Sequence, residues 1–346
     1  MLISKLIFLA FTFLISSIAV MALLSKQSND SKLDKLELWI YSFGLGPMCL
    51  TAILYFSLLL FPFFGQTLYL SIPIIIFTFL ITFYYKNIPF SILGRHILHT
   101  KKQNFLIRLF FLLLFIVFVL YAKTVSVIGH DVLEYATLGK YIAEERLIEY
   151  KANYYFPETG FYYVGLHGFS FPLLITWEHF FNSIFGVNNS IFIKAITIYY
   201  GFLLFILIYL ILKQYAKKLS YLALFILIAN LGFVSIIFSY HLDTARIFLH
   251  TALFIVMYRV LQNWNIQTLL LFSLIAGALS FLHSLGFITA GVLSIIILLA
   301  NKLSIKGKIF AALQLLAFII LMGGIHYFLD IFIGTGWIFN SSLKFY

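Results

Sequence analysis

Long apolar runs dominate this sequence and limit what it can fold into. A helix that crosses a bilayer needs roughly 20 mainly apolar residues, and ten stretches come close to that length. Hydrophobic side chains make up 63% of the 346 residues and charged side chains only 10%, whereas about a quarter of a soluble domain is charged. The sequence therefore predicts an all-α, polytopic membrane protein with about ten transmembrane helices. The stretches are residues 2–24, 38–62, 67–85, 105–122, 191–212, 219–238, 244–261, 267–283, 286–300 and 309–328.

The basic residues predict which helix ends face the cytoplasm. We assign successive gaps between the apolar stretches in turn to two sets, as if they lay on opposite sides of a membrane. One of the two sets holds most of the 23 lysines and arginines. Loops rich in Lys and Arg stay on the cytoplasmic side, so both termini and residues 123–190 are expected outside. Topology and anionic lipid account for the net charge of +11, and no nucleic acid is required. Richness in Ile, Phe, Lys and Asn is typical of an AT-rich bacterial genome, so we expect the bacterial inner membrane.

The first apolar stretch has a second interpretation as a secretory signal peptide. Lys5 precedes it, and residues 20–22 (VMA) resemble a small-residue cleavage site. The stretch is longer than the usual apolar part of a signal peptide, however, and its basic flank follows it at Lys26, Lys32 and Lys35. We therefore expect a membrane helix here, and cleavage would leave the remaining topology unchanged.

Residues 123–190 interrupt the apolar pattern and hold more than half of the chain's 12 acids. A structureless loop of this length is uncommon. The spacing of apolar residues predicts a short helix over 131–146 and a second over 172–185, the latter with an apolar and a polar face suited to the plane of the membrane. Between them, residues 150–168 are dense in Tyr and Phe without helical periodicity and are expected to be irregular. The acids of this external loop are Asp131, Glu134, Glu144, Glu145, Glu149, Glu158 and Glu178.

Two of these acids share a face of the first predicted helix. Asp131 and Glu134 are three residues apart and adjoin Tyr135, so a helix presents all three on one side. Carboxylates placed there could carry out chemistry at the outer membrane surface. The structural alternative is a capping box, in which Asp131 caps the helix start and Glu134 is its partner. The spacing alone leaves both interpretations open.

Four short segments carry a family resemblance. They are residues 129–142 (GHDVLEYATLGKYI), 167–174 (HGFSFPLL), 243–248 (DTARIF) and 277–284 (GALSFLHS). Their order and placement resemble the GT-C membrane glycosyltransferases, which include protein O-mannosyltransferases and the bacterial transferases that add aminoarabinose to lipid A. In that superfamily an acidic residue follows the helix that opens the catalytic core, a Tyr and a Gly come shortly after, and a His or Lys before Pro-Leu begins an interfacial helix.

The resemblance covers about residues 105–328. It implies N-terminal transmembrane helices over residues 1–104 and a GT-C-like catalytic core over 105–346. Four residues separate His167 from Pro172, where many relatives have the two adjacent, and about a hundred residues of extra membrane sequence precede the core. Many relatives also continue beyond the equivalent of the tenth stretch, so a fragment or a short member of the family is expected.

The resemblance implies transfer of a sugar, with inversion, from a polyprenyl-phosphate carrier to an external glycan, lipid or protein. One carboxylate must accept the proton of the acceptor hydroxyl, and we assign this role to Asp131, with Glu134 as a second, sugar-binding acid. A cation or hydrogen-bond donor must stabilise the departing phosphate, and His167 and Arg246 are the candidates. The predicted substrate-binding set is completed by Tyr135, His241, Asp243 and His283.

Several of these residues also have structural interpretations. Asp243 and Arg246 could form an ion pair in the first turn of a helix that Asp243 caps. His241 and His283 fall at predicted helix ends, where a histidine is more often a hydrogen-bonded turn residue than a ligand. Aromatic side chains of the external loop could stack against a sugar ring. These are Tyr154, Tyr155, Tyr162 and Tyr163.

No motif for a cofactor is present. The sequence has no Gly-rich phosphate loop, zinc-binding helix motif or serine-nucleophile elbow, and its single cysteine, Cys49, precludes a disulfide within the chain. A divalent ion shared by Asp131, Glu134 and Asp243 stays an open alternative. The alternative functions are a transporter or flippase for a lipid-linked glycan and a non-catalytic scaffold. Transporters place ionisable residues near the midplane of the membrane, whereas most acids here lie in the external loop, so we favour an enzyme.

Overall fold

The computed structural model describes most of the chain and is helical almost throughout. The described residues are 2–25, 35–88, 130–148, 154–156, 161–163, 168–186, 192–215, 219–238, 242–300 and 304–332, with single positions between 109 and 120. The predicted helical class is confirmed. The helices are α1 (Leu2–Ser25), α2 (Lys35–Leu60), α3 (Gln66–Tyr84), α6 (His130–Glu145), α7 (Ser170–Phe185), α8 (Phe192–Tyr215), α9 (Leu219–Ala229), α10 (Leu231–Phe238), α11 (Asp243–Gln262), α12 (Ile266–Leu282), α13 (Ser284–Ala300), α14 (Ile305–Ile319) and α15 (Ile325–Phe332), with short helical turns at Tyr85–Asn87 and Ile320–Gly324.

Five helices in the described part of the chain are long and apolar enough to cross a membrane. They are Leu36–Leu60, Gln66–Tyr84, Ile193–Tyr215, Asp243–Gln262 and the bent unit Ile305–Leu329. The segment Ala10–Ser25 and helices α12 and α13 are shorter and equally apolar. No water is present inside a bilayer to bind backbone N–H and C=O groups, so a chain crosses it as helices that satisfy these groups internally. The five long apolar helices therefore identify a membrane protein. The predicted span at 105–122 lies outside the described residues apart from single helical positions.

Two of the predicted spans are not straight helices. The span expected over 219–238 is divided into α9 and α10, with Asn230 between them. The span expected over 309–328 is interrupted by a π-helical turn, in which Gly323 has a φ of 100°. A Cβ atom at Gly323 would lie 2.5 Å from the ring of Phe281. The close approach of α12 therefore requires glycine at this bend, which hydropathy alone does not indicate.

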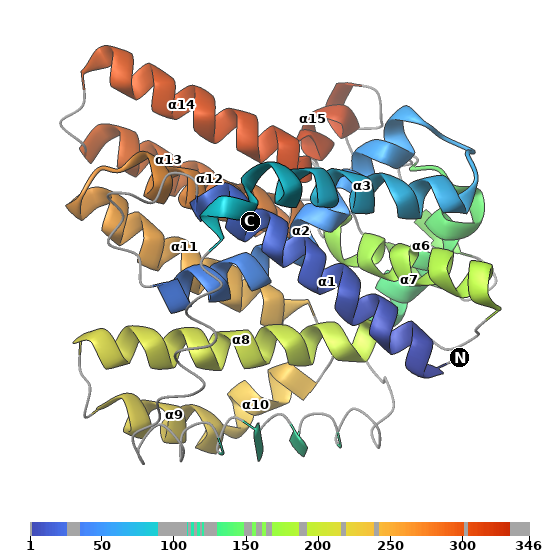
Figure 1. Ribbon diagram of the computed structural model, residues 1–346, viewed down its shortest axis with the longest axis horizontal. Helices are drawn as coiled ribbons and strands as arrows, with labels where there is room; N and C mark the ends of the chain where they lie inside the picture. The colour runs from blue at the N-terminus through green and yellow to red at the C-terminus, as the bar shows by residue number, and fades with distance from the viewer. Residues whose placement is uncertain are drawn as a thin grey trace.

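Helix α12 forms the centre of the bundle. It packs against α11, α13 and α14, and its side chains from Gln267 to Leu282 are buried. A helix that is apolar on every side is expected to be enclosed by others. The outward faces of α3, α13 and α14 carry exposed apolar side chains such as Phe79, Ile295 and Leu313, which suits contact with lipid. Figure 1 shows α11, α12, α13 and α14 running roughly side by side.

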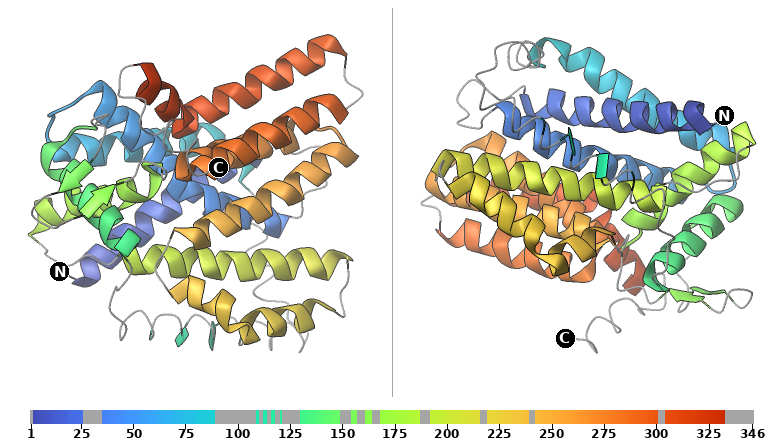
Figure 2. Two further views of the ribbon diagram at one scale, coloured as in Figure 1. Left: turned by 180° about the vertical axis from the view of Figure 1, so that it is seen from behind. Right: turned by 90° about the horizontal axis from the view of Figure 1, so that it is seen from below.

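Helices α6 and α7 gather at one end of the bundle, beside the N-terminal end of α1 (Figures 1 and 2). We call this the α6–α7 end. Two backbone hydrogen bonds connect it to the ends of longer helices: the Phe63 N–H donates to the Arg146 carbonyl (3.1 Å), and the Gly168 N–H donates to the Leu282 carbonyl (3.0 Å). Phe63, Arg146 and Gly168 lie in segments that the sequence predicts to be outside, and Leu282 lies near the outer end of the predicted span 267–283. These two bonds fix the α6–α7 end to the turn after α2 and to the end of α12.

Helix α7 is enclosed by protein, which corrects the prediction of a helix with one polar face. The predicted helix at 172–185 is present, but its side chains from Ser170 to Asn182 are buried apart from His179, and they include Glu178. Helices α2, α3, α6 and α8 pack around it. The sequence of one helix shows its polar face but not the elements that cover that face. Here α6 and the bundle cover the polar side of α7.

Candidate active site

Helix α6 is held against α7 by close backbone packing. A Cβ atom at Gly139 would lie 2.6 Å from the Pro172 carbonyl oxygen, so glycine permits the approach. The Thr176 hydroxyl donates to the Gly139 carbonyl oxygen at 2.9 Å. These contacts fix the position of α6 at mid-length without using any charged side chain.

The carboxyl group of Glu134 is buried in this layer. Glu134 is 4% exposed, and its neighbour Tyr135 is fully buried with its ring edge-on to Phe171 at 5.3 Å between centroids. Buried glutamates are rare in proteins, so this position is a strong candidate for a functional acid. The described helix begins at His130, which places Asp131 in its first turn. The Asp131 side chain lies outside the described residues, so its role as base stays a prediction.

The chain entering α7 is fixed to the turn between α12 and α13. A Cβ atom at Gly168 would lie 1.7 Å from the Phe281 carbonyl oxygen, and the Gly168 N–H bonds to the adjacent Leu282 carbonyl. His167 lies outside the described residues. Its neighbour Gly168 nonetheless connects two of the segments that carry the family resemblance, residues 167–174 and 277–284.

His283 is a turn residue, as the structural interpretation predicted. Its Nδ1 atom accepts a hydrogen bond from the Leu285 N–H at 3.0 Å, which caps the first turn of α13. The His283 side chain is 6% exposed. The histidine therefore shapes the turn to which Gly168 is bound. His241, the second histidine of this kind, lies outside the described residues.

Asp243 and Arg246 form the ion pair that the sequence left open. Arg246 Nη2 and Asp243 Oδ1 are 2.6 Å apart, and each side chain is 28% exposed. The helix-capping part of that interpretation is wrong, because α11 has Leu242 at its N-cap and no side-chain cap hydrogen bond. The pair lies at the start of α11, near the end of the predicted span 244–261 that is expected to face outside. Substrate binding by these two residues, and a divalent ion shared by Asp131, Glu134 and Asp243, remain predictions.

The aromatic part of the external loop is a β-hairpin, where the sequence predicted irregular structure. Strands β1 (Tyr154–Phe156) and β2 (Phe161–Tyr163) are antiparallel, with Tyr154 opposite Tyr163 and Tyr155 opposite Tyr162. Aromatic residues favour strands because they pair across them. The expectation failed because helical periodicity was sought and a short strand has a period of two. The hairpin packs beside α6 through β2.

His326 is a residue of this end that the sequence analysis missed. It lies in α15, is 1% exposed, and contacts Phe169 with 4.6 Å between ring centroids. Phe169 follows Gly168 and also packs against Tyr55 of α2. An ionisable residue inside a membrane span is often functional. His326 lies within the tenth predicted span, so the sequence alone could have indicated it.

The opposite end of the bundle contains a buried ionic cluster that the sequence analysis also missed. The Arg259 guanidinium of α11 binds both carboxylate oxygens of Glu37 on α2, one of them at 2.9 Å. The Gln214 side chain of α8 donates to the same carboxylate and accepts from Arg259 at 3.2 Å. Glu37 is fully buried. Three helices are thus joined at the end that the sequence predicts to be cytoplasmic.

Comparison of the chain with protein-family models, with curated proteins and with solved structures gave no match. The GT-C resemblance therefore depends on the short segments of the sequence itself. The structure brings two of these segments together through Gly168 and Leu282, and it places a third, residues 129–142, largely in a helix that packs on α7.

Proposed function

We propose that this protein is an inverting glycosyltransferase that uses a polyprenyl-phosphate-linked sugar and acts at the outer face of the membrane. The observation that carries the proposal is the buried Glu134 carboxyl group, one helical turn from Asp131, at an end of the apolar bundle. Active sites commonly hold acids in environments of low dielectric constant, where electrostatic interactions are strong. A lipid-linked donor has its phosphate at the level of the headgroups, and the ends of membrane helices lie at the same level.

The topology that we propose has about ten membrane spans and an external segment over residues 123–190. It is supported by the hydrogen bonds that join helix ends of the same predicted side. At the predicted cytoplasmic end, Gln267 donates to the Leu24 carbonyl at 2.7 Å, and Arg259 binds Glu37. At the α6–α7 end, Phe63 bonds to Arg146. In this orientation the candidate acids face the outside.

The proposed reaction is a single displacement at the anomeric carbon. Asp131 accepts the proton of the acceptor hydroxyl while the acceptor oxygen forms a bond to the anomeric carbon. The bond from that carbon to the phosphate oxygen breaks on the opposite face, and the phosphate keeps the electron pair. Arg246 supplies positive charge for the phosphate, and Glu134 binds a hydroxyl of the sugar. The product is inverted, and the carrier leaves as polyprenyl phosphate.

The position of the buried ionisable groups favours an enzyme over a transporter. In transporters, ionisable residues near the midplane bind the cargo. The buried Glu37–Arg259 pair lies near the first turn of α2 and the last turn of α11, and it is already neutralised. Glu134 likewise belongs to α6, which is shorter than a membrane span.

The proposal is tested by reconstituting the full chain in vesicles with a panel of polyprenyl-phosphate hexoses and pentoses and measuring release of polyprenyl phosphate. Asp131→Asn is expected to lower the rate by about 10²–10⁴-fold, the range for loss of a general base. Glu134→Gln should also lower it. Glu144→Gln is the matched control, because Glu144 lies on the same helix, is 62% exposed and pairs only with Lys140 at 3.6 Å among the described contacts.

Two results would contradict the proposal. One is a parental rate of release in the Asp131→Asn variant. The other is movement of the intact lipid-linked sugar across the bilayer by the parental chain with no release of polyprenyl phosphate, which would identify a flippase.

A further inference from the structure

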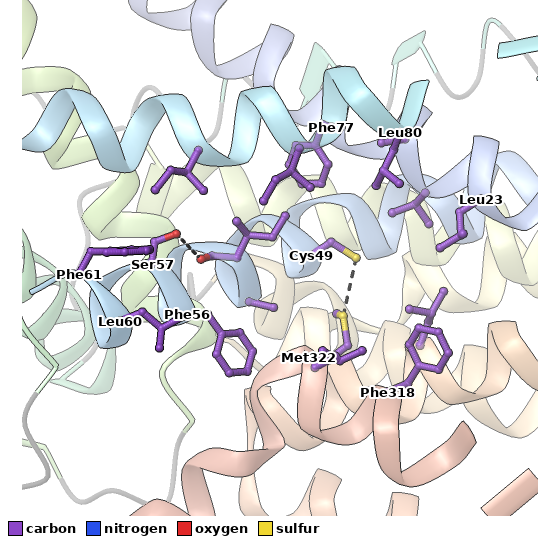
Figure 3. Close-up of a pocket in the computed structure, with 18 residues that line it drawn as sticks. Leu23, Cys49, Phe56, Ser57, Leu60, Phe61, Phe77, Leu80, Phe318 and Met322 are labelled. Carbon is purple, nitrogen blue, oxygen red and sulfur yellow. Dashed lines mark hydrogen bonds between the residues drawn. The ribbon is translucent and has the colours of Figure 1, made fainter. Parts of the chain in front are cut away.

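An apolar cavity of about 480 Å³ opens between α1, α2 and α3 on one side and α12 and α14 on the other (Figure 3). Its polar lining is confined to two groups that already have partners. The Ser57 hydroxyl donates to the Ile53 carbonyl oxygen at 2.7 Å, and the Cys49 sulfur lies 3.7 Å from the sulfur of Met322. The walls therefore offer a ligand hydrocarbon contacts and little else.

The size of the cavity matches a single acyl chain. A methylene group fills roughly the volume of a water molecule, about 30 Å³, so the cavity holds about sixteen of them. Along α2 the lining runs from Cys49 to Phe61, which at 1.5 Å per residue is about 18 Å. That is close to the length of an extended chain of sixteen carbons. The polyprenyl chain of a sugar carrier is much longer than the cavity, so most of it would lie outside.

One end of the cavity has the features of a membrane interface. Leu60 and Phe61 line it there and are 65% and 44% exposed, and the exposed rings of Phe63 and Phe64 follow in the turn between α2 and α3. Aromatic side chains are enriched at the level of the headgroups. The Arg146 guanidinium reaches this turn and donates to the Phe64 carbonyl oxygen at 3.5 Å. A guanidinium has five N–H donors and binds phosphate well.

We infer that this cavity binds one acyl chain of an anionic membrane phospholipid, with the phosphate of its headgroup on Arg146. The site is separate from the proposed sugar-donor site. Arg146 directly follows α6, whereas Asp131 is in the first turn of the same helix, and the fifteen residue steps from one to the other correspond to about 22 Å. A phosphate on Arg146 is too far from Asp131 to be the reacting phosphate, so the inference does not depend on the proposed function.

The first test is native mass spectrometry of the full chain in mild detergent, with dipalmitoyl phosphatidylglycerol as the probe. We expect one lipid bound per parental chain. Ala52→Phe places a ring in the cavity and should reduce the bound fraction at least tenfold. Ala229→Phe is the control, because Ala229 is exposed on α9 and does not line the cavity. Arg146→Gln should weaken binding severalfold, whereas Lys140→Gln, at an exposed lysine of the same helix, should not.

The second test uses only the parental chain, so its result does not depend on whether a variant folds. Phosphatidylglycerol with a photoreactive diazirine in its acyl chain is added to the parental chain, and the crosslinked peptides are identified. We expect crosslinks concentrated in residues 49–61, in and directly after α2, and in residues 72–80 of α3, and we expect excess unlabelled phosphatidylglycerol to suppress them. Crosslinks spread evenly over the exposed faces of α13 and α14 would overturn the inference. So would displacement of the probe by undecaprenyl phosphate and not by phosphatidylglycerol, since the cavity would then hold the sugar carrier.

Discussion

The two ends of the helical bundle are held together in different ways. At the predicted cytoplasmic end, ionic side chains join the helices, as Arg259 and Gln214 bind the buried Glu37. At the α6–α7 end, the connections that hold the segments are backbone hydrogen bonds and close glycine packing, at Gly168 and Gly139. The contrast indicates that charge serves assembly at the first end. At the second end the contacts at Gly168 and Gly139 use no charged side chain, so we expect the acids there to serve chemistry more than assembly.

The largest effect on stability is expected at the ionic cluster. Arg259→Met leaves the Glu37 carboxylate buried without its guanidinium, and breaking a buried pair in this way costs about 3–5 kcal/mol. The double variant Glu37→Leu with Arg259→Met should recover most of that loss, because no charge stays buried. Thermal unfolding in detergent measures both. Lys213→Met is the control at the same end, since within the described part of the chain Lys213 approaches the ring of Tyr209 at 5.7 Å and joins no ion pair. An Arg259→Met variant as stable as the parent would show that the ionic cluster does not stabilise the predicted cytoplasmic end.

The next effect is expected at Gly168. The methyl group of Gly168→Ala would meet the Phe281 carbonyl at 1.7 Å, so the chain must shift, at a cost of about 1–3 kcal/mol. Because the shift moves the start of α7, sugar transfer should fall together with stability. Gly291→Ala is the control, since a Cβ atom there meets nothing within 4 Å. Equal behaviour of the two variants in unfolding and transfer assays would show that the attachment at Gly168 is dispensable.

A smaller effect is expected at Tyr69, which fastens the turn before α3. Its hydroxyl donates to the Phe61 carbonyl at 2.5 Å and accepts from the Phe64 N–H at 3.1 Å. Tyr69→Phe removes both bonds at about 1 kcal/mol each, and the melting temperature should fall while transfer largely persists. Tyr85→Phe, at an exposed ring on the same segment, should change neither. A Tyr69→Phe variant that lost transfer but kept its stability would place Tyr69 in the chemistry.

The smallest effect on stability is expected at the partly exposed Asp243–Arg246 pair. Ion pairs with this exposure contribute under about 1 kcal/mol, so Arg246→Gln should unfold almost as the parent does. Its effect on the release of polyprenyl phosphate should be larger than its effect on stability, because Arg246 is proposed to face the departing phosphate. Unfolding and release measured on the same preparation separate the two. A variant that loses stability and keeps its rate would make the pair purely structural.

The sequence was sufficient for features that depend on local pattern. The long helices follow from apolar runs, and the helices at 131–146 and 172–185 were predicted near their observed bounds. Contacts between distant residues were not predictable in this way. Glu37 and Arg259 are 222 residues apart, and Arg259 was counted only as a basic residue near a helix end. The bend at Gly323 and the burial of Glu178 likewise depend on neighbours that hydropathy does not identify.

Of the candidate site, the sequence identified the segments and left the contacts open. The structural interpretation of His283 is confirmed by its bond to Leu285, and the ion pair of Asp243 with Arg246 is present. For His283 the sequence favoured the turn over a ligand, whereas for Asp243 and Arg246 it left the ion pair and substrate binding equally open. His326 was not predicted as a site residue, because none of the segments that carry the family resemblance lies in the last span. In the structure, α15 brings His326 to the same end as α6 and α7.

The central claim is that a carboxylate at the start of α6 removes a proton during sugar transfer while the fold does not need it. The most direct measurement is the rate of polyprenyl phosphate release by the reconstituted Asp131→Asn variant, with its melting temperature recorded on the same sample. The account predicts a melting temperature equal to the parent's and a rate lower by about two orders of magnitude or more. A variant that melts with the parent and releases polyprenyl phosphate as fast would contradict it.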